Sequence, residues 1–261
     1  MLLTLPIELL DDVVFELFDK DRVRVLMTCK RLFHISSRLI YRNIDVHARS
    51  ARLLFCILAS PSTTIVKYGD YVRSLAFSVA SNADIYVSYP VLCKALGQLT
   101  RITTLRLFVP PKFSHFLLQQ LRIHGIIPAG DTAAHVARLP PPVTLYSSPR
   151  NFIPPHLHQL MVGGDLKFLE IARYRSMTAV NIVEPIGYHG LAYVMEVLTC
   201  RGVGEAVTIR QLGLSLDFPT ESGASYALEA LATAFPELRE LAFYTPHANG
   251  LVRIPVSERG S

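Results

Sequence analysis

The chain has 261 residues, of which 50% are hydrophobic and only 18% are charged, which excludes global disorder and provides ample material for a core. Its formal net charge of +5 comes from scattered Lys and Arg residues, without the basic stripe and interleaved aromatic residues of a nucleic-acid-binding protein. There is no secretory signal pattern, no run of about 18 apolar residues that would predict a membrane span, and no CxxC pair among the four cysteines. We therefore expect an intracellular protein of the cytoplasm or nucleus, with no structural zinc.

The first 42 residues predict three short helices. Apolar residues at positions 9, 10, 13, 14 and 17 follow the spacing of a helix face, so a first helix is expected over residues 5–18, with Pro6 in its first turn. A break at 19–21, a second helix over 21–33 and a third over 34–42 follow. A helical unit this small cannot bury its own apolar side chains. They need an outside surface, which could be a partner protein or the end of the following domain.

Basic residues are densest in this same region, between Lys20 and Arg42, where seven of them accompany one acid, Asp21. We interpret them as solvated helix faces. The alternative is that they steer the chain toward an acidic protein partner.

Strand and helix patterns alternate through most of the remaining chain. Strands are expected at 71–77, 102–109, 156–162, 177–184, 209–218 and 238–245. Helices are expected at 51–59, 89–99, 113–124, 165–174, 189–202 and 225–235. The Pro-rich stretch 110–155 is interpreted as an insertion that holds the helix at 113–124 and is partly disordered near 128–150, and the tail 246–261 as frayed.

The spacing of the strands suggests a repeat. Strand centres lie at Leu75, Leu105, Leu160, Val180, Leu214 and Leu241. The gaps between them are 30, 55, 20, 34 and 27 residues, and the gap of 55 is close to two units. Relaxed L-x-x-L-x-L patterns at Ile102–Leu107 and Leu238–Phe243 favour a leucine-rich-repeat-like solenoid. An ordinary α/β domain with a parallel sheet is the alternative. No helix follows the last strand, which suggests a truncated array.

Catalytic motifs are missing from the sequence. It contains no GxSxG, P-loop, HExxH or GxGxxG pattern. His156 and His158 would share a strand face, but no third metal ligand has suitable spacing. We therefore expect no enzyme activity, no catalytic residues, no cofactor and no metal.

A family resemblance lies in the N-terminal region. The order Leu5-Pro6-x-Glu8-Leu9-Leu10, Val13-Val14, Leu17, Asp21, Val25-Leu26, Cys29-Lys30-Arg31-Leu32 and Leu39-x-Tyr41-x-x-Ile44 resembles the F-box motif. Leu32 stands where many F-boxes carry Trp, and Asp21-Arg22 stands where the second helix often begins with Asp-Leu. The whole chain is similar to fungal F-box proteins with irregular leucine-rich C-terminal regions.

The resemblance implies a mixed fold (α+β or α/β): a three-helix F-box followed by an irregular leucine-rich-repeat-like strand–helix solenoid. The expected organisation is an F-box-like domain (1–46), first repeat units (47–109), the insertion (110–155), further units (156–245) and the tail (246–261).

The resemblance also implies a function. F-box proteins are substrate-receptor subunits of SCF-type ubiquitin ligases, which dock on Skp1 and thereby on a cullin, and recruit a protein substrate through the C-terminal region. The residues expected to contact Skp1 or to pack the helices beneath it are Leu5, Pro6, Leu9, Leu10, Val13, Val14, Leu17, Leu26, Cys29 and Leu32. The alternative is a non-catalytic leucine-rich interaction scaffold not linked to ubiquitination.

Overall fold

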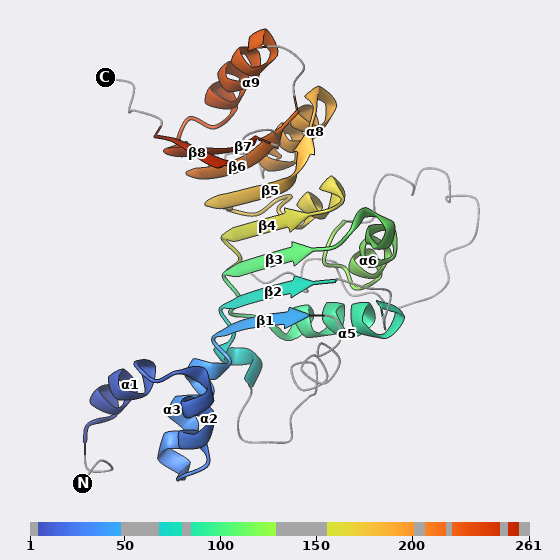
Figure 1. Ribbon diagram of the computed structural model, residues 1–261. Helices are drawn as coiled ribbons and strands as arrows, with labels where there is room; N and C mark the ends of the chain where they lie inside the picture. Colours follow the sequence, from blue (N-terminus) through green and yellow to red (C-terminus); the bar gives the residue numbers. More distant parts are fainter. Residues whose placement is uncertain are drawn as a thin grey trace.

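The computed structural model describes residues 5–47, 68–79, 85–128, 156–200, 207–217, 221–245 and 250–255, and shows three N-terminal helices joined to a large sheet (Figure 1). The helices are α1 (Ile7–Phe15), α2 (Asp19–Leu26), α3 (Lys30–Ile40), α5 (Ile85–Gln98), α6 (Pro111–Ile123), α8 (Tyr188–Thr199) and α9 (Glu221–Ala234), with 3-10 helices η2 (Tyr68–Tyr71) and η4 (Leu166–Ile171). The strands are β1 (Asn43–His47), β2 (Ser74–Ser78), β3 (Thr104–Phe108), β4 (Gln159–Gly163), β5 (Ala179–Ile186), β6 (Gln211–Leu216), β7 (Glu240–Thr245) and β8 (Gly250–Pro255).

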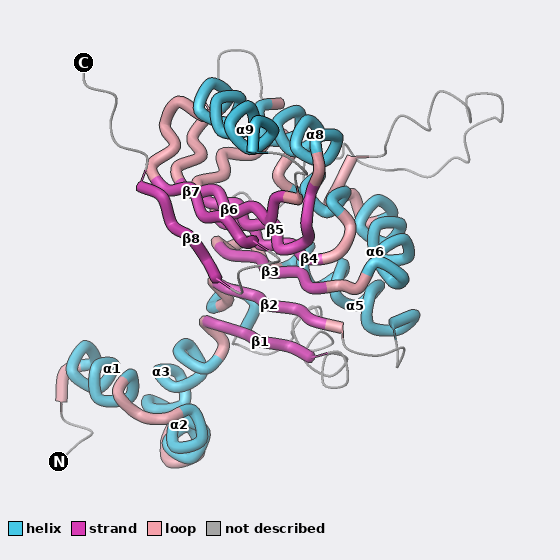
Figure 2. Tube along the Cα trace, turned by 45° about the horizontal axis from the view of Figure 1, so that its top comes forward, coloured by secondary structure: helices cyan, strands magenta, loops and turns pink. Residues whose placement is uncertain are grey.

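The order of the strands in the sheet is the same as their order in the chain, because each strand pairs with the next one in sequence. Strands β1 to β7 are parallel, and β8 pairs antiparallel with β7. Helices α5, α6, α8 and α9 lie along the same side of this sheet (Figure 2). The α/β class expected from the sequence is confirmed in this form, as helices with a seven-stranded parallel sheet.

The core lies between the sheet and these helices. Side chains alternate along each strand, and two registered rows point toward the helices. The first row is Ile44, Leu75, Leu105, Leu160, Val180, Leu212 and Leu241, and the second begins Val46, Phe77, Leu107, Val162, Ile182 and Leu214. The two relaxed leucine motifs of the sequence supply Leu105, Leu107 and Leu241 of these rows.

The opposite side of the sheet, called the free face below, carries the alternating positions. It includes Asn43, Ser74, Thr104, Gln159 and Gln211 in one row and Asp45, Ala76, Arg106, Met161 and Asn181 in the next. None of the helices in the described ranges covers this face (Figure 2). Polar side chains bridge neighbouring strands: the Thr104 hydroxyl donates to Gln159 Oε1 at 3.1 Å, and Gln211 Nε2 donates to Glu240 Oε2 at 3.1 Å.

The expected boundaries of the N-terminal helices are wrong after the first helix. Residues 19–21 begin α2 instead of breaking the chain, and the expected helix over 21–33 is interrupted at residues 27–29. The Thr28 hydroxyl donates to the Val25 carbonyl at 2.7 Å, and the Cys29 backbone is extended (φ −158°, ψ 161°). The hydroxyl thus donates a hydrogen bond to a carbonyl in the last turn of α2, where the helix ends. Helix α3 starts only after Cys29.

Four other expectations need correction. Residues 43–47 form a strand that was not expected, and it crosses the proposed boundary between residues 46 and 47. The helix expected over 165–174 is the short 3-10 helix η4. The tail is not wholly frayed, because β8 extends the sheet. The gap of 55 residues does not add a strand to the sheet, because β3 pairs directly with β4.

Two other expectations cannot be compared with the structure. The helix expected at 51–59 lies outside the described residues, as does most of the disorder expected near 128–150.

Candidate functional site

The N-terminal helices form a small module with its own core. Leu10 and Val14 of α1 and Ile35 of α3 are almost completely buried, at 1%, 2% and 2% exposure. Leu5, Val25, Leu32 and Leu39 pack around them and are partly buried. The inward stripe of α1 is therefore used to hold the three helices together.

Hydrogen bonds and an ion pair from arginine side chains connect the parts of this module. The guanidinium of Arg22 donates to the Val14 carbonyl at 3.1 Å and to the Phe15 carbonyl, where a positive charge complements the C-terminal end of α1. Arg31 donates to the Leu5 carbonyl at 2.8 Å, and Arg38 of α3 pairs with Asp11 of α1. Part of the basic stretch interpreted as solvated helix faces thus connects one helix to another.

The structure separates the ten expected contact residues into three groups. Leu10 and Val14 are buried inside the module. Leu5, Leu17, Leu26, Cys29 and Leu32 are partly buried. Pro6, Leu9 and Val13 are exposed, and Leu9 and Val13 lie one turn apart on α1. The last group is the most accessible to a partner.

Further exposed apolar side chains of the module were not among the expected contacts. They are Ile7, Phe15, Phe18, Val23 and Met27, with exposed fractions of 49%, 56%, 77%, 48% and 82%. Together with Leu9 and Val13 we call these side chains the apolar surface of the module; they lie on α1, at Phe18 between α1 and α2, on α2 and at Met27 directly after it. Half of the exposed large hydrophobic residues in the described ranges, seven of 14, fall between residues 7 and 27. This concentration of exposed apolar side chains makes the module the candidate interaction site.

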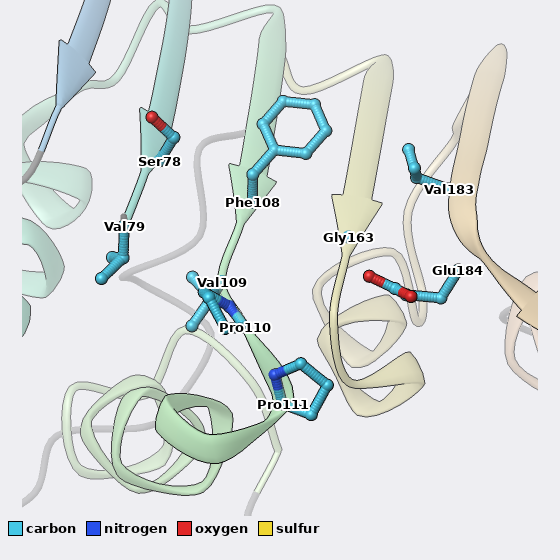
Figure 3. A pocket seen from close by; sticks show the side chains of 9 residues that line it. All are labelled: Ser78, Val79, Phe108, Val109, Pro110, Pro111, Gly163, Val183 and Glu184. Atoms are coloured by element: carbon cyan, nitrogen blue, oxygen red, sulfur yellow. The ribbon is translucent and has the colours of Figure 1, made fainter. Parts of the chain in front are cut away.

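A second feature is a hollow of about 350 Å³ at the carboxyl ends of the central strands (Figure 3). It is lined by Ser78, Val79, Phe108, Val109, Pro110, Pro111, Gly163, Val183 and Glu184. The residues come from β2, β3, β4 and β5 and from the start of α6, which are far apart in the sequence. Parallel strands bring their ends to one edge, which is how this site is assembled.

Burial strongly shifts the pKa of two side chains outside the hollow. Burial raises the pKa of Cys93 to about 12, so its thiol stays protonated. Burial also lowers the pKa of Arg175 to about 9, although its Nη2 atom donates to the Ile126 carbonyl at 3.2 Å. His156 and His158 are both exposed, and the searched part of the chain holds no group of three or more His, Cys, Asp or Glu suited to a metal ion.

Comparison with models of known protein families gives no match, and a search of curated proteins gives none either. Within the described ranges, no helix has both the length and the apolar character needed to cross a membrane.

Proposed function

We propose that this chain is the substrate receptor of an SCF-type ubiquitin ligase. In this proposal the module docks on a Skp1-type adaptor, and thereby on a cullin, while the sheet recruits a protein substrate. The observation that carries the proposal is the apolar surface of a three-helix module whose sequence resembles an F-box. The receptor would act by proximity, raising the effective concentration of the substrate near the ubiquitin-carrying subunit.

The sheet region supports the second half of the proposal. Seven parallel strands in chain order, with helices on one side, are the arrangement expected of an irregular leucine-rich-repeat-like solenoid. Its free face is a broad surface of small, polar and a few charged side chains. Such a face suits recognition of a protein segment better than chemistry on a small molecule.

Burial of the apolar surface would contribute favourable free energy to docking. Full burial of a Val, Leu, Ile, Phe or Met side chain contributes about 1.5–3 kcal/mol. Covering several half-exposed side chains at once would therefore supply several kcal/mol toward binding. Leu9 and Val13 are suitable docking probes, because both are about half exposed and neither belongs to the module's core.

The docking test uses purified Skp1 and full-length chain in a pull-down followed by calorimetry. Leu9→Asp combined with Val13→Asp places two charges on the apolar surface and is expected to abolish binding. Tyr226→Asp combined with Leu228→Asp makes the same change on α9, at side chains that are 68% and 37% exposed, and should leave binding intact. The proposal fails if the wild-type chain does not bind Skp1, or if the Leu9/Val13 variant binds as well as wild type.

Leu10 serves as the folding control and is unsuitable as a docking probe. Leu10→Ala removes a buried side chain, which typically costs about 2–5 kcal/mol of stability. Leu9→Ala at the neighbouring exposed position should change stability by no more than about 0.5 kcal/mol. Hydrogen exchange in α1 to α3 distinguishes the two variants. Equal loss of protection would mean that Leu9 also belongs to the core.

An alternative function is a non-catalytic interaction scaffold in which the module is only an end cap of the sheet. One observation favours it: α3 leads directly into β1, and Tyr41 stacks on Tyr68 of η2 with ring centroids 4.6 Å apart. An end cap would have the same connection. Failure of the wild-type chain to bind Skp1 in the test above would favour this alternative.

A further inference from the structure

The hollow at the carboxyl ends of β2 to β5 differs from the rest of the free face because the regular pairing is interrupted there. The register between β5 and β6 is continuous up to Ile182 and resumes at Pro185, so Val183 and Glu184 form an irregularity in β5. Such bulges redirect side chains and are frequent near functional sites. Here the bulge places both residues in the wall of the hollow.

A glycine on the neighbouring strand keeps the hollow open. A Cβ atom at Gly163 of β4 would lie 3.0 Å from Cδ1 of Phe108 and 3.8 Å from Cβ of Val183. Any larger residue would thus occupy the space between these two side chains. Figure 3 shows the Phe108 ring between the ends of β3 and β4, with the Glu184 carboxylate pointing toward the end of β4.

The chemistry of the walls restricts the ligand. The amides of Val79 and Val109 already donate to the carbonyls of Phe108 and Gly163, both at 3.0 Å, and prolines have no amide proton to offer. The walls therefore offer few hydrogen-bond donors. Glu184 is partly buried, and in the described part of the chain its carboxylate has no cation or hydrogen-bond donor as partner. The hollow presents an acceptor, a negative charge, an aromatic face and aliphatic surface.

We infer that this hollow binds a lysine or arginine side chain of an extended segment from a partner protein. The aliphatic stem of such a side chain would pack on the valines and on Pro111, and its cationic head would pair with Glu184 next to the face of Phe108. A volume of about 350 Å³ is at the lower end for ligand sites, so it suits one or two side chains. The inference does not depend on docking to Skp1.

The test measures binding of fluorescent eight-residue peptide pools to the full-length chain by anisotropy, at about 0.15 M salt, which is near physiological ionic strength. Each pool has a fixed central residue, which is arginine, lysine, norleucine or glutamate, and flanks randomised over small neutral residues. The arginine and lysine pools should bind wild type about tenfold more tightly than the norleucine pool, as expected for a charge-assisted contact.

Two variants test whether the preference for the arginine and lysine pools arises from the hollow. Glu184→Gln keeps the shape of the side chain and removes its charge, so the tenfold preference should disappear. Asp45→Asn removes an exposed carboxylate from β1 on the same free face and should leave the preference unchanged. Circular dichroism melts establish that both variants are folded.

Three outcomes would overturn the inference: no detectable binding of any pool, equal binding of all pools, or a preference that survives Glu184→Gln. A preference lost equally in Asp45→Asn would indicate a diffuse field over the free face and would also overturn it. Binding of Skp1 is measured on the same variants. Because it should be unaffected by Glu184→Gln, failure of the two proposals can be told apart.

Discussion

At the scale of single residues, a carboxylate links η4 to α8. Arg173 donates to Glu170 through Nε at 2.6 Å and through Nη2 at 2.9 Å, and the Tyr193 hydroxyl donates to the same carboxylate at 2.8 Å. Burial by itself raises the pKa of Glu170, but the hydrogen bonds from Arg173 and Tyr193 outweigh it, so the pKa lies below its ordinary value. The ionised form is therefore the one that stabilises the fold.

This arrangement makes part of the stability depend on pH. A carboxylate whose pKa is lowered in the folded state contributes its full stabilisation at pH values above its unfolded pKa of 4.5. That stabilisation is lost as the pH falls through the lower pKa of the folded state. Glu170→Gln should reduce the free energy of unfolding by about 2 kcal/mol at pH 7 and by progressively less as the pH falls below 4.5. Urea titrations at several pH values measure this difference.

The control for this prediction is Glu196→Gln. Glu196 also pairs with Arg173, at 3.2 Å, but its side chain is 65% exposed, so its removal should have little effect at any pH. The interpretation of Glu170 is contradicted if its variant loses the same free energy of unfolding at about pH 3 as at about pH 7.

At the scale of elements, a glycine determines how β4 leaves the sheet. Gly164 follows β4 with φ of +110°, and a Cβ atom there would lie 1.9 Å from the Val109 carbonyl oxygen. Gly125, directly after the C-cap of α6, also has a positive φ of 67°, but nothing lies within 4 Å of its Cβ position. A side chain at Gly125 would therefore cause backbone strain alone, whereas a side chain at Gly164 would cause both backbone strain and a steric clash.

Alanine substitution at these two positions is expected to have unequal effects. Gly125→Ala should cost about 1 kcal/mol, which is the cost of a left-handed conformation for an L-residue. Gly164→Ala adds a clash with backbone and should cost about 3 kcal/mol or more. Thermal unfolding monitored by circular dichroism measures both. Equal losses would show that the loop after β4 can move away from Val109.

Elements with a strong internal period could be predicted from the sequence. The strands β2 to β7 were located because alternating leucines, valines and isoleucines mark their buried rows, and α1 because its apolar positions follow a helical period. The elements that were missed depend on pairing. Residues 43–47 directly follow a helix, and residues 250–255 become a strand through their contact with β7. Neither pairing is visible in the local pattern.

The candidate surfaces were predictable only in part. The family resemblance of the sequence predicts α1 as a docking element, but the helix is apolar on several sides. Contact with Ile35 of α3 determines which stripe of α1 faces inward. The sequence alone therefore could not show that Leu10 is buried and Leu9 exposed. The hollow around Gly163 was not predictable, because its walls come from strand ends that are distant in the chain.

At the scale of the whole molecule, the order of the strands predicts how the protein unfolds. Each strand pairs with its neighbours in the chain, so stability is distributed along the sheet and each region depends mainly on adjacent units. Phe77 of β2 and Phe235 after α9 are both almost fully buried, at 0% and 1% exposure, and lie toward opposite ends of the sheet. They form a matched pair for testing this distribution.

Removing either ring should unfold mainly its own half. Phe77→Ala and Phe235→Ala are each expected to cost about 3–5 kcal/mol locally. Hydrogen exchange should then show loss of protection in β1 to β3 for the first variant and in β6 and β7 for the second. Uniform loss of protection in both variants would show that the sheet unfolds as one cooperative unit.

The reversed direction of β8 has a consequence for self-assembly. A parallel sheet built in chain order could in principle continue from one molecule to the next, with the first strand of a second chain added to β7. In this fold β8 occupies that edge and runs antiparallel to β7. Head-to-tail fibres that extend the parallel ladder from β7 are therefore blocked while β8 stays in place.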